Sequence, residues 1–447
     1  MNLWKIAWRS IQQRSLASLL TGLSMALGVS LVVTVLVVGQ VVEKSFASGN
    51  ALGYNVIVGA KGGRLDLLLN TVYYLNRPIE NVPWDYYKEF LSADQRSDHT
   101  KGKFAEDVGM AIPVCLGDVV GENGEFRVVG TTPRLFSELL NSDFSSGTNF
   151  KHDDFATGVL GAEVAKQLKL KVGESFEPAH GVGGEKHMPF KITGILARTG
   201  TPVDRAAFVN MEGFFLIPDH AKGHVEEPKH EQAGEHAKAG EHDEEHEELL
   251  KQPLPEDQRE VTAVLIRTAS IGGAPPELTA PDLVKRVNKD FVAQAIEPIK
   301  EISVLTNTFV KPLQLILLGL TVLIVIVAGV GIMVSIYNSM SERRHEIAVM
   351  RALGAHRGRI MMIVLAESIL LALGGGLAGW LAGHIIVGAA GPLITEYTGV
   401  AAGFLQFVPK FELILIPGLI ALASLVGYLP AVSAYRTDVA RALSATP

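Results

Sequence analysis

The hydrophobic pattern divides the chain into long apolar runs near both ends and a mixed region between them. Four runs carry no Asp, Glu, Lys or Arg and are 27, 30, 28 and 23 residues long, at Leu16–Val42, Pro312–Ser341, Ser368–Thr395 and Leu413–Tyr435. A helix of about 20 apolar residues crosses the hydrocarbon core of a bilayer. The pattern therefore predicts four membrane-spanning helices, and none of the runs is long enough to cross twice.

The first apolar run follows an amphipathic segment, residues 1–15. Trp4 and Trp8 share one helical face with other apolar side chains, and Lys5 and Arg9 lie on the opposite face. Such a helix suits the membrane surface, with tryptophan at headgroup depth. The alternative is a cleaved secretory signal, whose apolar core is about 7–15 residues. The greater length of this run favours an uncleaved transmembrane helix.

Basic residues predict the orientation of these helices. The segment between the second and third runs holds five arginines, at positions 343, 344, 351, 357 and 359. The positive-inside rule places this segment in the cytoplasm, and with it both termini, because four helices return the chain to its starting side. Residues 43–310 then lie outside the cytoplasm.

The central region, residues 43–310, alternates short strand and helix patterns. Tyr54–Val58 and Phe190–Leu196 are typical of strands, and Val159–Gly173 predicts a strand, a turn and an amphipathic helix. The predicted fold class is therefore membrane α-helical, with four transmembrane helices and a large extracytoplasmic α+β domain between helices 1 and 2. Its length allows one unit or two lobes.

Charge and cysteine content exclude several classes of protein. The chain has a net charge of −7, and residues 43–310 alone carry −13. This acidic balance argues against a nucleic-acid partner, which requires a basic face. A single cysteine, Cys115, excludes an intramolecular disulfide framework and a cysteine-rich zinc module. Its apolar neighbours favour a buried structural side chain over a reactive one. No nucleophile elbow or HExxH motif is present, so no catalytic residue is predicted.

The third apolar run carries candidate packing and ionisable residues. Gly375, Gly379 and Gly383 recur at every fourth position, so another helix can approach this face closely. The alternative is that the glycines only loosen the helix. Glu367 and His384 lie in or beside this run. Ionisable groups inside a membrane are functional candidates, and the alternative here is a boundary residue in contact with water.

A histidine-rich acidic segment interrupts the central region. Asp219–Glu248 contains eleven acidic residues, three lysines and six of the thirteen histidines. Such low-complexity sequence cannot bury a core, so we predict a disordered insertion over 219–250. The imidazoles and carboxylates favour weak binding of Zn²⁺ or another divalent metal, and the alternative is a solvated acidic linker. The candidate ligands are His220, His224, His230, His236, His242 and His246. No other cofactor is expected.

The arginine-rich segment and its flanks carry a recognisable motif. Its matching residues are Glu342, Arg343, Glu346, Ile347, Arg351, Ala352, Leu353, Gly354 and Ala355, then Glu367 at the start of a glycine-rich helix, and Pro430, Ala431 and Ala434 near the C-terminus. In these positions the chain resembles the MacB/FtsX-like permeases of ABC transporters. The resemblance covers the chain outside 219–250.

The resemblance implies a multi-pass permease of the bacterial inner membrane with no fused ATPase domain. Such a permease binds cytoplasmic ABC ATPase subunits and pairs with a second copy or a paralogue. ATP hydrolysis by the partner moves the periplasmic domain (mechanotransmission), for export, extraction or release of an envelope substrate. A periplasmic partner protein and membrane lipids are further expected contacts. Two alternatives remain open: a divalent-metal handling system that uses the histidine-rich segment, and a signal relay that transports nothing and activates an envelope enzyme.

The resemblance also implies that the segment 338–360 couples the permease to the ATPase. The expected coupling residues are Glu342, Arg343, Arg344, Glu346, Ile347, Met350, Arg351, Leu353 and Gly354. Three of them, Ile347, Met350 and Leu353, can anchor a helix in a groove, and the arginines can meet acidic partner residues. The alternative is a basic turn that only fixes the orientation.

These patterns give the predicted domain boundaries. They are a cytoplasmic amphipathic helix at 1–15, transmembrane helix 1 at 16–42, a periplasmic domain at 43–310, transmembrane helix 2 at 312–337, the coupling segment at 338–360, transmembrane helix 3 at 361–390, a short periplasmic loop at 391–412, transmembrane helix 4 at 413–435 and a cytoplasmic tail at 436–447.

Overall fold

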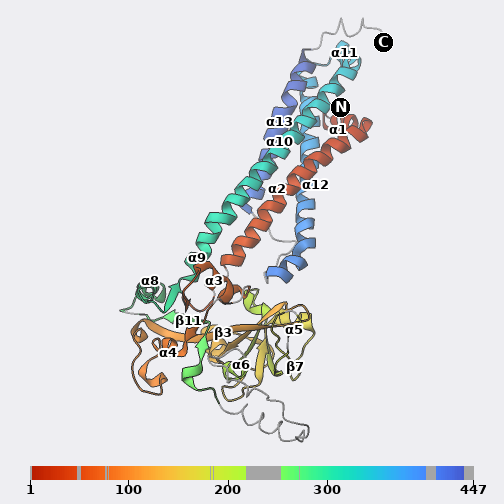
Figure 1. The fold of residues 1–447 in the computed structure, drawn as a ribbon. Coiled ribbons are helices and arrows are strands. Elements are labelled where there is room, and N and C mark those ends of the chain that lie inside the picture. Colours follow the sequence, from red (N-terminus) through yellow and green to blue (C-terminus); the bar gives the residue numbers. More distant parts are fainter. Residues whose placement is uncertain are drawn as a thin grey trace. The chain divides into compact units, whose positions relative to one another are not determined.

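The computed structural model divides into two compact units (Figure 1). The structure describes residues 3–47, 52–75, 78, 80–181, 183–184, 186–217, 253–270, 272–398 and 409–436. The first unit is Met1–Lys44, Thr306–Thr395 and Ala401–Pro447, and the second is Ser45–Leu305 with Glu396–Val400. The histidine-rich segment 219–250 and its six candidate ligands lie outside the described residues.

The first unit, which we call the helical unit, is built from six α-helices in the described residues. They are α1 (Leu3–Gln13), α2 (Ser15–Ala47), α10 (Lys311–Glu342), α11 (Arg344–Ala352), α12 (Arg357–Thr398) and α13 (Pro409–Tyr435). Four spans are long and apolar enough to cross a membrane, at Ser15–Val41, Pro298–Glu342, Arg357–Ile394 and Glu412–Tyr435. The prediction of four helices able to span a membrane is thus confirmed.

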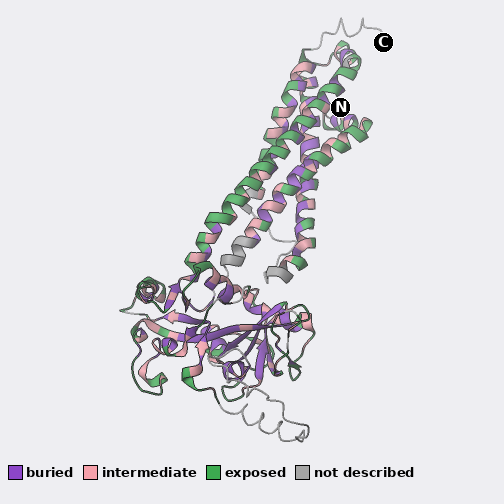
Figure 2. Cartoon of the chain, viewed as in Figure 1, coloured by how far each residue is buried: buried purple, intermediate pink, exposed green. Residues whose placement is uncertain are grey.

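The long helices are apolar on their outer faces as well as between one another. Leu16, Leu315 and Leu413 are exposed, as are many other large apolar side chains of these helices. Exposed positions recur along the long helices (Figure 2). A helix that is apolar all round is stable only in lipid or in a deep core. The hydrocarbon of a bilayer is a medium that suits such outer faces.

The helices extend beyond the apolar runs that predicted them. Helix α2 continues through Glu43 and Lys44 to Ala47, and α12 continues past Thr395 to Thr398. The predicted loop 391–412 is therefore helical at 391–398 and again from 409, and its remainder lies outside the described residues. A charged residue ends an apolar run, but it does not interrupt the backbone hydrogen bonds of a helix.

The second unit, which we call the α+β unit, contains a ten-stranded mixed sheet. Its strands are β1 (Val56–Ala60), β3 (Val108–Val120), β4 (Phe126–Thr131), β5 (Phe144–Gly147), β6 (Thr157–Leu160), β7 (Ser175–Phe176), β8 (Phe190–Leu196), β9 (Ala206–Asn210), β11 (Ala263–Thr268) and β12 (Ala293–Ile296). The order is β12-β1-β11-β3-β4-β9-β6-β8-β5, and β7 pairs with β8. The pairs β4–β9 and β6–β8 are parallel and the others antiparallel. Strands β2 (Val82–Pro83) and β10 (Glu260–Val261) form a separate pair.

Both faces of the large sheet are buried. Successive residues of a strand point to opposite faces, so Val56 and Val58 join one apolar cluster and Ile57 joins the other. Helix α8 (Pro276–Val287) covers the first face through Leu283, and α3 (Arg64–Tyr73) covers the second through Leu68. The other α-helices in the described part of this unit are α4 (Trp84–Lys88), α5 (Ala162–Leu168), α6 (Met211–Phe215) and α9 (Pro298–Leu305). The sheet forms one layer of one compact unit, not two lobes.

Cys115 lies on β3 and is buried, in agreement with its apolar sequence neighbours. Its Sγ donates to the carbonyl oxygen of Glu260 over 3.4 Å. Burial raises the pKa of the thiol to about 12, so the reactive thiolate is scarce at neutral pH.

We expect Cys115 of the native protein to resist maleimide at pH 7–8 and to react fully after denaturation. A Lys101→Cys variant, at an exposed position, supplies the matched reactive thiol. Mass spectrometry of the labelled chain gives both rates. If Cys115 of the native chain labels as fast as the introduced cysteine, the side chain is not held in the buried position.

Candidate functional site

Polar side chains of the helical unit meet where α10 ends and α11 begins. Arg343 separates the two helices, with φ −96° and ψ 10°. Its guanidinium donates to Ser10 Oγ and to Gln13 Oε1, both on α1. Ser10 Oγ donates in turn to Glu367 Oε2 on α12 over 3.0 Å. Three segments far apart in the sequence are therefore linked by one chain of hydrogen bonds.

An ion pair reinforces this connection beside α1. Arg14 pairs with Glu342 at the end of α10, and Arg343 Nε lies 3.9 Å from Glu346 Oε2. We call the set Ser10, Gln13, Arg14, Glu342, Arg343 and Glu367 the α1 joint. Ser10 and Glu367 are buried. Hydrogen bonding makes such burial of a carboxyl group tolerable, because an unpartnered one would be strongly destabilising.

The surface of α11 differs from the one that the sequence suggested. Ile347 and Ala348 are buried, so Ile347 is not available as an anchor for a partner. Leu353, 83% exposed, and Val349, 39% exposed, are the large apolar side chains that α11 and its C-terminal end leave uncovered. Gly354 follows with φ +97°, a conformation that favours glycine and that turns the chain toward α12.

The other expected coupling residues are spread around α11. Glu342 and Glu346 are exposed, and Met350 and Arg351 are half-buried. Arg344 is the first residue of the helix. The segment therefore presents charged and apolar groups together, on a helix whose other face is buried in its own unit.

The three predicted packing glycines all face α2. A Cβ atom at Gly379 would lie 2.9 Å from Ala26 Cα and 2.9 Å from Val29 Cβ. At Gly375 it would lie 2.7 Å from the carbonyl oxygen of Gly22, and at Gly383 2.8 Å from Val33 Cβ. Because real Cβ contacts are longer than these, α12 approaches α2 at a distance that only glycine permits.

Other glycines close the remaining helix contacts. A Cβ atom at Gly28 of α2 would lie 3.1 Å from Val325 of α10, and at Gly329 of α10 it would lie 3.2 Å from Val426 of α13. These positions do not recur at a fixed spacing, so no pattern along the chain predicts their role. The bundle is thus held by close backbone approach at several of its interfaces.

Glu367 and His384, the two ionisable residues that the sequence singles out on α12, are both buried in the protein. Glu367 belongs to the α1 joint. His384 is 2% exposed, and its Nε2 lies 3.6 Å from Glu412 Oε1 in the first turn of α13. Trp380 Nε1 donates to Glu412 Oε2 over 3.2 Å. Polar contacts therefore tie α12 to α1 at one end and to α13 at the other.

The α+β unit contains a cavity of about 400 Å³ beside α4. Trp84 and Tyr87 supply aromatic walls. Four basic residues line it, and each is paired with at least one acid: Lys88, Arg96, Arg134 and Arg259. Its volume lies in the range of small-molecule sites, about 300–1,000 Å³.

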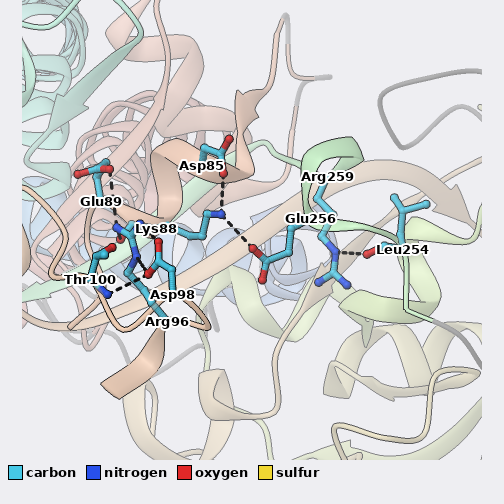
Figure 3. A network of polar contacts seen from close by, with 9 residues as sticks. All are labelled: Asp85, Lys88, Glu89, Arg96, Asp98, Thr100, Leu254, Glu256 and Arg259. Carbon is cyan, nitrogen blue, oxygen red and sulfur yellow. Dashed lines mark hydrogen bonds and ion pairs between the residues drawn. The ribbon is translucent and has the colours of Figure 1, made fainter. Parts of the chain in front are cut away.

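Ion pairs fix the basic side chains of this cavity, and Figure 3 shows those of Lys88 and Arg96. Lys88 Nζ lies 2.7 Å from Asp85 and 2.9 Å from Glu256, so it bridges two acids. The Arg96 guanidinium donates to Asp98 over 2.7 Å and holds the pKa of that carboxyl well below its usual range. The charged groups are therefore held in place before any ligand arrives.

Comparison with known proteins identifies both units. Residues 18–234 match the MacB-like periplasmic core domain, and residues 318–439 match the FtsX-like permease C-terminal domain. The chain belongs to the MacB/FtsX-like family of ABC transporter permeases. The family resemblance inferred from the α11 motif is thereby confirmed, and the four apolar helices together with the family imply a protein of the bacterial inner membrane.

Several relatives of this permease are export proteins. The macrolide export ATP-binding/permease protein MacB of Mannheimia succiniciproducens is 29% identical over 185 residues, which are 41% of this chain and 27% of the relative. MacB of Rhodopseudomonas palustris strain BisB18 is 34% identical over 165 residues, 35% of this chain and 22% of the relative. The pyoverdine export ATP-binding/permease protein PvdT of Pseudomonas aeruginosa is 25% identical over 98% of this chain and 58% of its own length. The permease spans about a quarter of the length of the first curated relatives that it matches.

Proposed function

We propose that this permease couples ATP hydrolysis by a separate cytoplasmic ABC ATPase subunit to movement of its periplasmic domain, for export, extraction or release of an envelope substrate. The α1 joint is the observation that carries the proposal. It connects α11, the proposed docking helix for the ATPase, to α1 and α12 through charged hydrogen bonds. A force on α11 would therefore act on several helices together.

In this mechanism the docking contact is made by the exposed side of α11. Leu353 and Val349 are the apolar groups available to enter a groove, and Glu346 is available to a basic partner residue. Helix-in-groove recognition uses a few such anchors on one face of a helix. Arg343, by contrast, is occupied within the permease and would transmit force instead of forming the contact.

The close packing of α2 and α12 would carry the movement across the membrane. Since Gly375, Gly379 and Gly383 bring the two backbones together, neither helix can slide far without moving the other. Helix α2 continues along the chain into the α+β unit, which begins at Ser45. The chain then returns from this unit into α10. These two connections would convert helix movement into movement of the periplasmic domain.

The cavity beside α4 is the candidate contact for the envelope substrate. Aromatic walls and fixed, paired charges suit a molecule that has both apolar and ionic groups. On the family resemblance, a second permease copy or a paralogue completes the transporter, and a periplasmic protein is a further partner. The proposed orientation places both termini and α11 in the cytoplasm. Metal handling by the segment 219–250 remains a separate proposal, on residues outside those that the structure describes.

Exchange of Arg343 and Glu346 tests the proposed coupling. The Arg343→Glu/Glu346→Arg variant keeps the net charge but removes the hydrogen bonds of Arg343 to Ser10 and Gln13. Hydrogen bonds to a charged group contribute about 1.5–3 kcal/mol each. We expect ATP hydrolysis to continue in the reconstituted complex, while the ATP-driven response of a fluorophore attached at a Lys101→Cys site falls at least about tenfold.

The same exchange at Glu163 and Lys166 is the matched control. These two residues of α5 are also three positions apart, and their charged groups are 3.8 Å apart. This control should keep the ATP-driven response. An undiminished response in the Arg343/Glu346 exchange would contradict the coupling role of the α1 joint.

A further inference from the structure

Two histidines and an aspartate form a cluster in the α+β unit that neither the proposed coupling nor the cavity uses. Asp118 lies on β3, and His180 and His187 lie between β7 and β8. His180 Nδ1 is 2.7 Å from Asp118 Oδ1, and His187 Nε2 is 3.4 Å from Asp118 Oδ2. One ligand atom from each of the three side chains lies within 4.8 Å of the others.

We propose that Asp118, His180 and His187 bind a divalent transition-metal ion such as Zn²⁺, with one coordination position open to solvent. Imidazole nitrogen and carboxylate oxygen are both zinc ligands, and three protein ligands with an open fourth position are typical of sites that accept water or a further ligand. The same donor set holds other first-row divalent ions, so the site is defined by its ligands and not by one metal.

The distances suit tetrahedral coordination after a small adjustment. Metal–ligand bonds of about 2.0–2.2 Å at tetrahedral angles place neighbouring donor atoms about 3.3–3.5 Å apart. His187 Nε2 already lies at this distance from Asp118 Oδ2, at 3.4 Å. His180 Nδ1 lies 2.7 Å from the other carboxylate oxygen, Oδ1, so the His180 ring has to shift for both histidines and one carboxylate oxygen to meet at a single ion. His180 is able to make that change because its side chain is 38% exposed.

The backbone fixes the three residues beside one another. The pairing of β3 with β4 shifts register between Leu116 and Val119, and such bulges redirect side chains at sites of binding or catalysis. Val119 and Ala179 exchange two backbone hydrogen bonds, of 3.0 and 2.9 Å, next to Asp118 and His180. The N–H of His187 donates to the carbonyl oxygen of Pro178 over 2.9 Å. Because the backbone sets the positions of the ligands before metal arrives, little ordering entropy opposes binding.

Protein covers two of the three ligands, and the site is open to solvent beside the third, His180. The side chains of Asp118 and His187 are 1% and 6% exposed, whereas that of His180 is 38% exposed. The rings of His180 and His187 meet edge to face with centroids 4.4 Å apart, so neither ring lies flat over the other. An ion would enter from the side of His180, and solvent would fill the open position.

This site is independent of ATPase coupling and of the histidine-rich segment. It uses none of the six histidines of 219–250 and none of the residues of the α1 joint. The competing occupant is a proton, because a protonated imidazole paired with Asp118 makes similar contacts. The experiment must therefore detect the metal directly, in a protein from which the histidines of 219–250 have been removed.

Cobalt titration of the full-length protein tests the proposal. The starting protein is the purified chain in detergent with all six histidines of 219–250 replaced by glutamine, and Co²⁺ reports its own coordination through visible absorption. We expect one equivalent to bind with the absorption of a four-coordinate ion, and Zn²⁺ to displace it. His180→Gln, His187→Gln and Asp118→Asn should each weaken binding at least about 100-fold. Loss of a residue that only hydrogen-bonds to a metal ligand weakens metal binding by up to about 100-fold, and loss of a ligand itself should cost at least as much.

His152→Gln is the matched control, because His152 is an exposed histidine of the same unit. This variant should bind Co²⁺ as the starting protein does. His180→Gln is the decisive variant, because the side chain of His180 is the most exposed of the three and contributes least to folding. Circular dichroism verifies that each variant is folded. The proposal is overturned if the starting protein binds no Co²⁺ equivalent, or if folded His180→Gln binds as tightly as His152→Gln.

Discussion

Replacement of Arg259 by methionine is expected to destabilise the α+β unit by about 3–5 kcal/mol, the cost of breaking a buried ion pair from one side. Arg259 Nη1 lies 3.0 Å from Glu212 Oε1, and the two side chains are only 9% and 8% exposed. Methionine keeps most of the volume of arginine but leaves the carboxylate of Glu212 buried without its cation. The free energy of unfolding falls because the folded state then holds an uncompensated charge.

Further contacts of Arg259 add to this effect. Its Nε donates to the carbonyl oxygen of Leu254 over 2.6 Å (Figure 3). The guanidinium also lies 5.3 Å from the ring centroid of Trp84 and 5.5 Å from that of Phe215. Cation–π contacts of this kind are each worth about 0.5–2 kcal/mol, depending on how far they are desolvated. The same side chain lines the cavity, so its loss would also change the candidate substrate contact.

Thermal unfolding of the full-length protein in detergent measures this effect, and two further variants define its cause. Lys101→Met breaks an ion pair with Glu106 whose partners are 54% and 78% exposed, and it should cost less than about 1 kcal/mol. A double variant, Arg259→Met with Glu212→Leu, should recover much of the stability because it removes both charges. Equal losses for Arg259→Met and Lys101→Met would show that burial of the pair does not matter.

Replacement of Gly379 by leucine is expected to separate α12 from α2 and to remove the coupling that depends on their contact. A Cβ atom at this position would already lie 2.9 Å from Ala26 Cα, which is backbone and cannot rotate away. Overpacking costs about 1–3 kcal/mol when side chains can shift, and a clash with backbone belongs at the upper end of that range, about 3 kcal/mol. Unfolding by SDS in mixed micelles, followed by tryptophan fluorescence, gives the loss of stability.

Gly374 supplies the control for this variant on the same helix. A Cβ atom at Gly374 would meet no atom of another described segment within 4 Å, so Gly374→Leu should change the stability by no more than about 0.5 kcal/mol. Both variants add the same leucine to α12, and they differ only in the face that it occupies. If Gly374→Leu is as destabilising as Gly379→Leu, helix conformation and not close packing is the cause.

Much of the α+β unit could be predicted from local patterns. Phe190–Leu196 is a strand with those bounds, and the strand, turn and helix predicted within Val159–Gly173 are β6 and α5. These segments have alternating or helical periodicity that one stretch of chain carries by itself. The order of the strands could not be predicted in this way, because β1 pairs with β11 and β12, which lie more than 200 residues further along the chain.

The candidate sites were less accessible from the sequence. The motif at 342–354 pointed to α11, but it gave no sign that Ile347 is buried or that Arg343 binds Ser10 and Gln13. The sequence showed Glu367 and His384 as ionisable residues near a membrane helix. It did not indicate that their partners are Ser10 and Glu412. The two histidines of the proposed metal site lie between β7 and β8 and are seven positions apart, a spacing that signals no metal motif. Their partner Asp118 lies on β3, a separate part of the chain.

The sequence by itself determined that this protein has four membrane helices, a mixed α+β unit and the motifs of its permease family, because each of these depends on residues that are neighbours along the chain. Only the tertiary structure decided which side chains meet: Arg343 with Ser10, Gly379 with Ala26, Arg259 with Glu212, and Asp118 with His180 and His187. Such contacts depend on the packing of segments that are far apart in the chain. The hydrophobic pattern of one segment does not identify the residues of the other segment that it will contact.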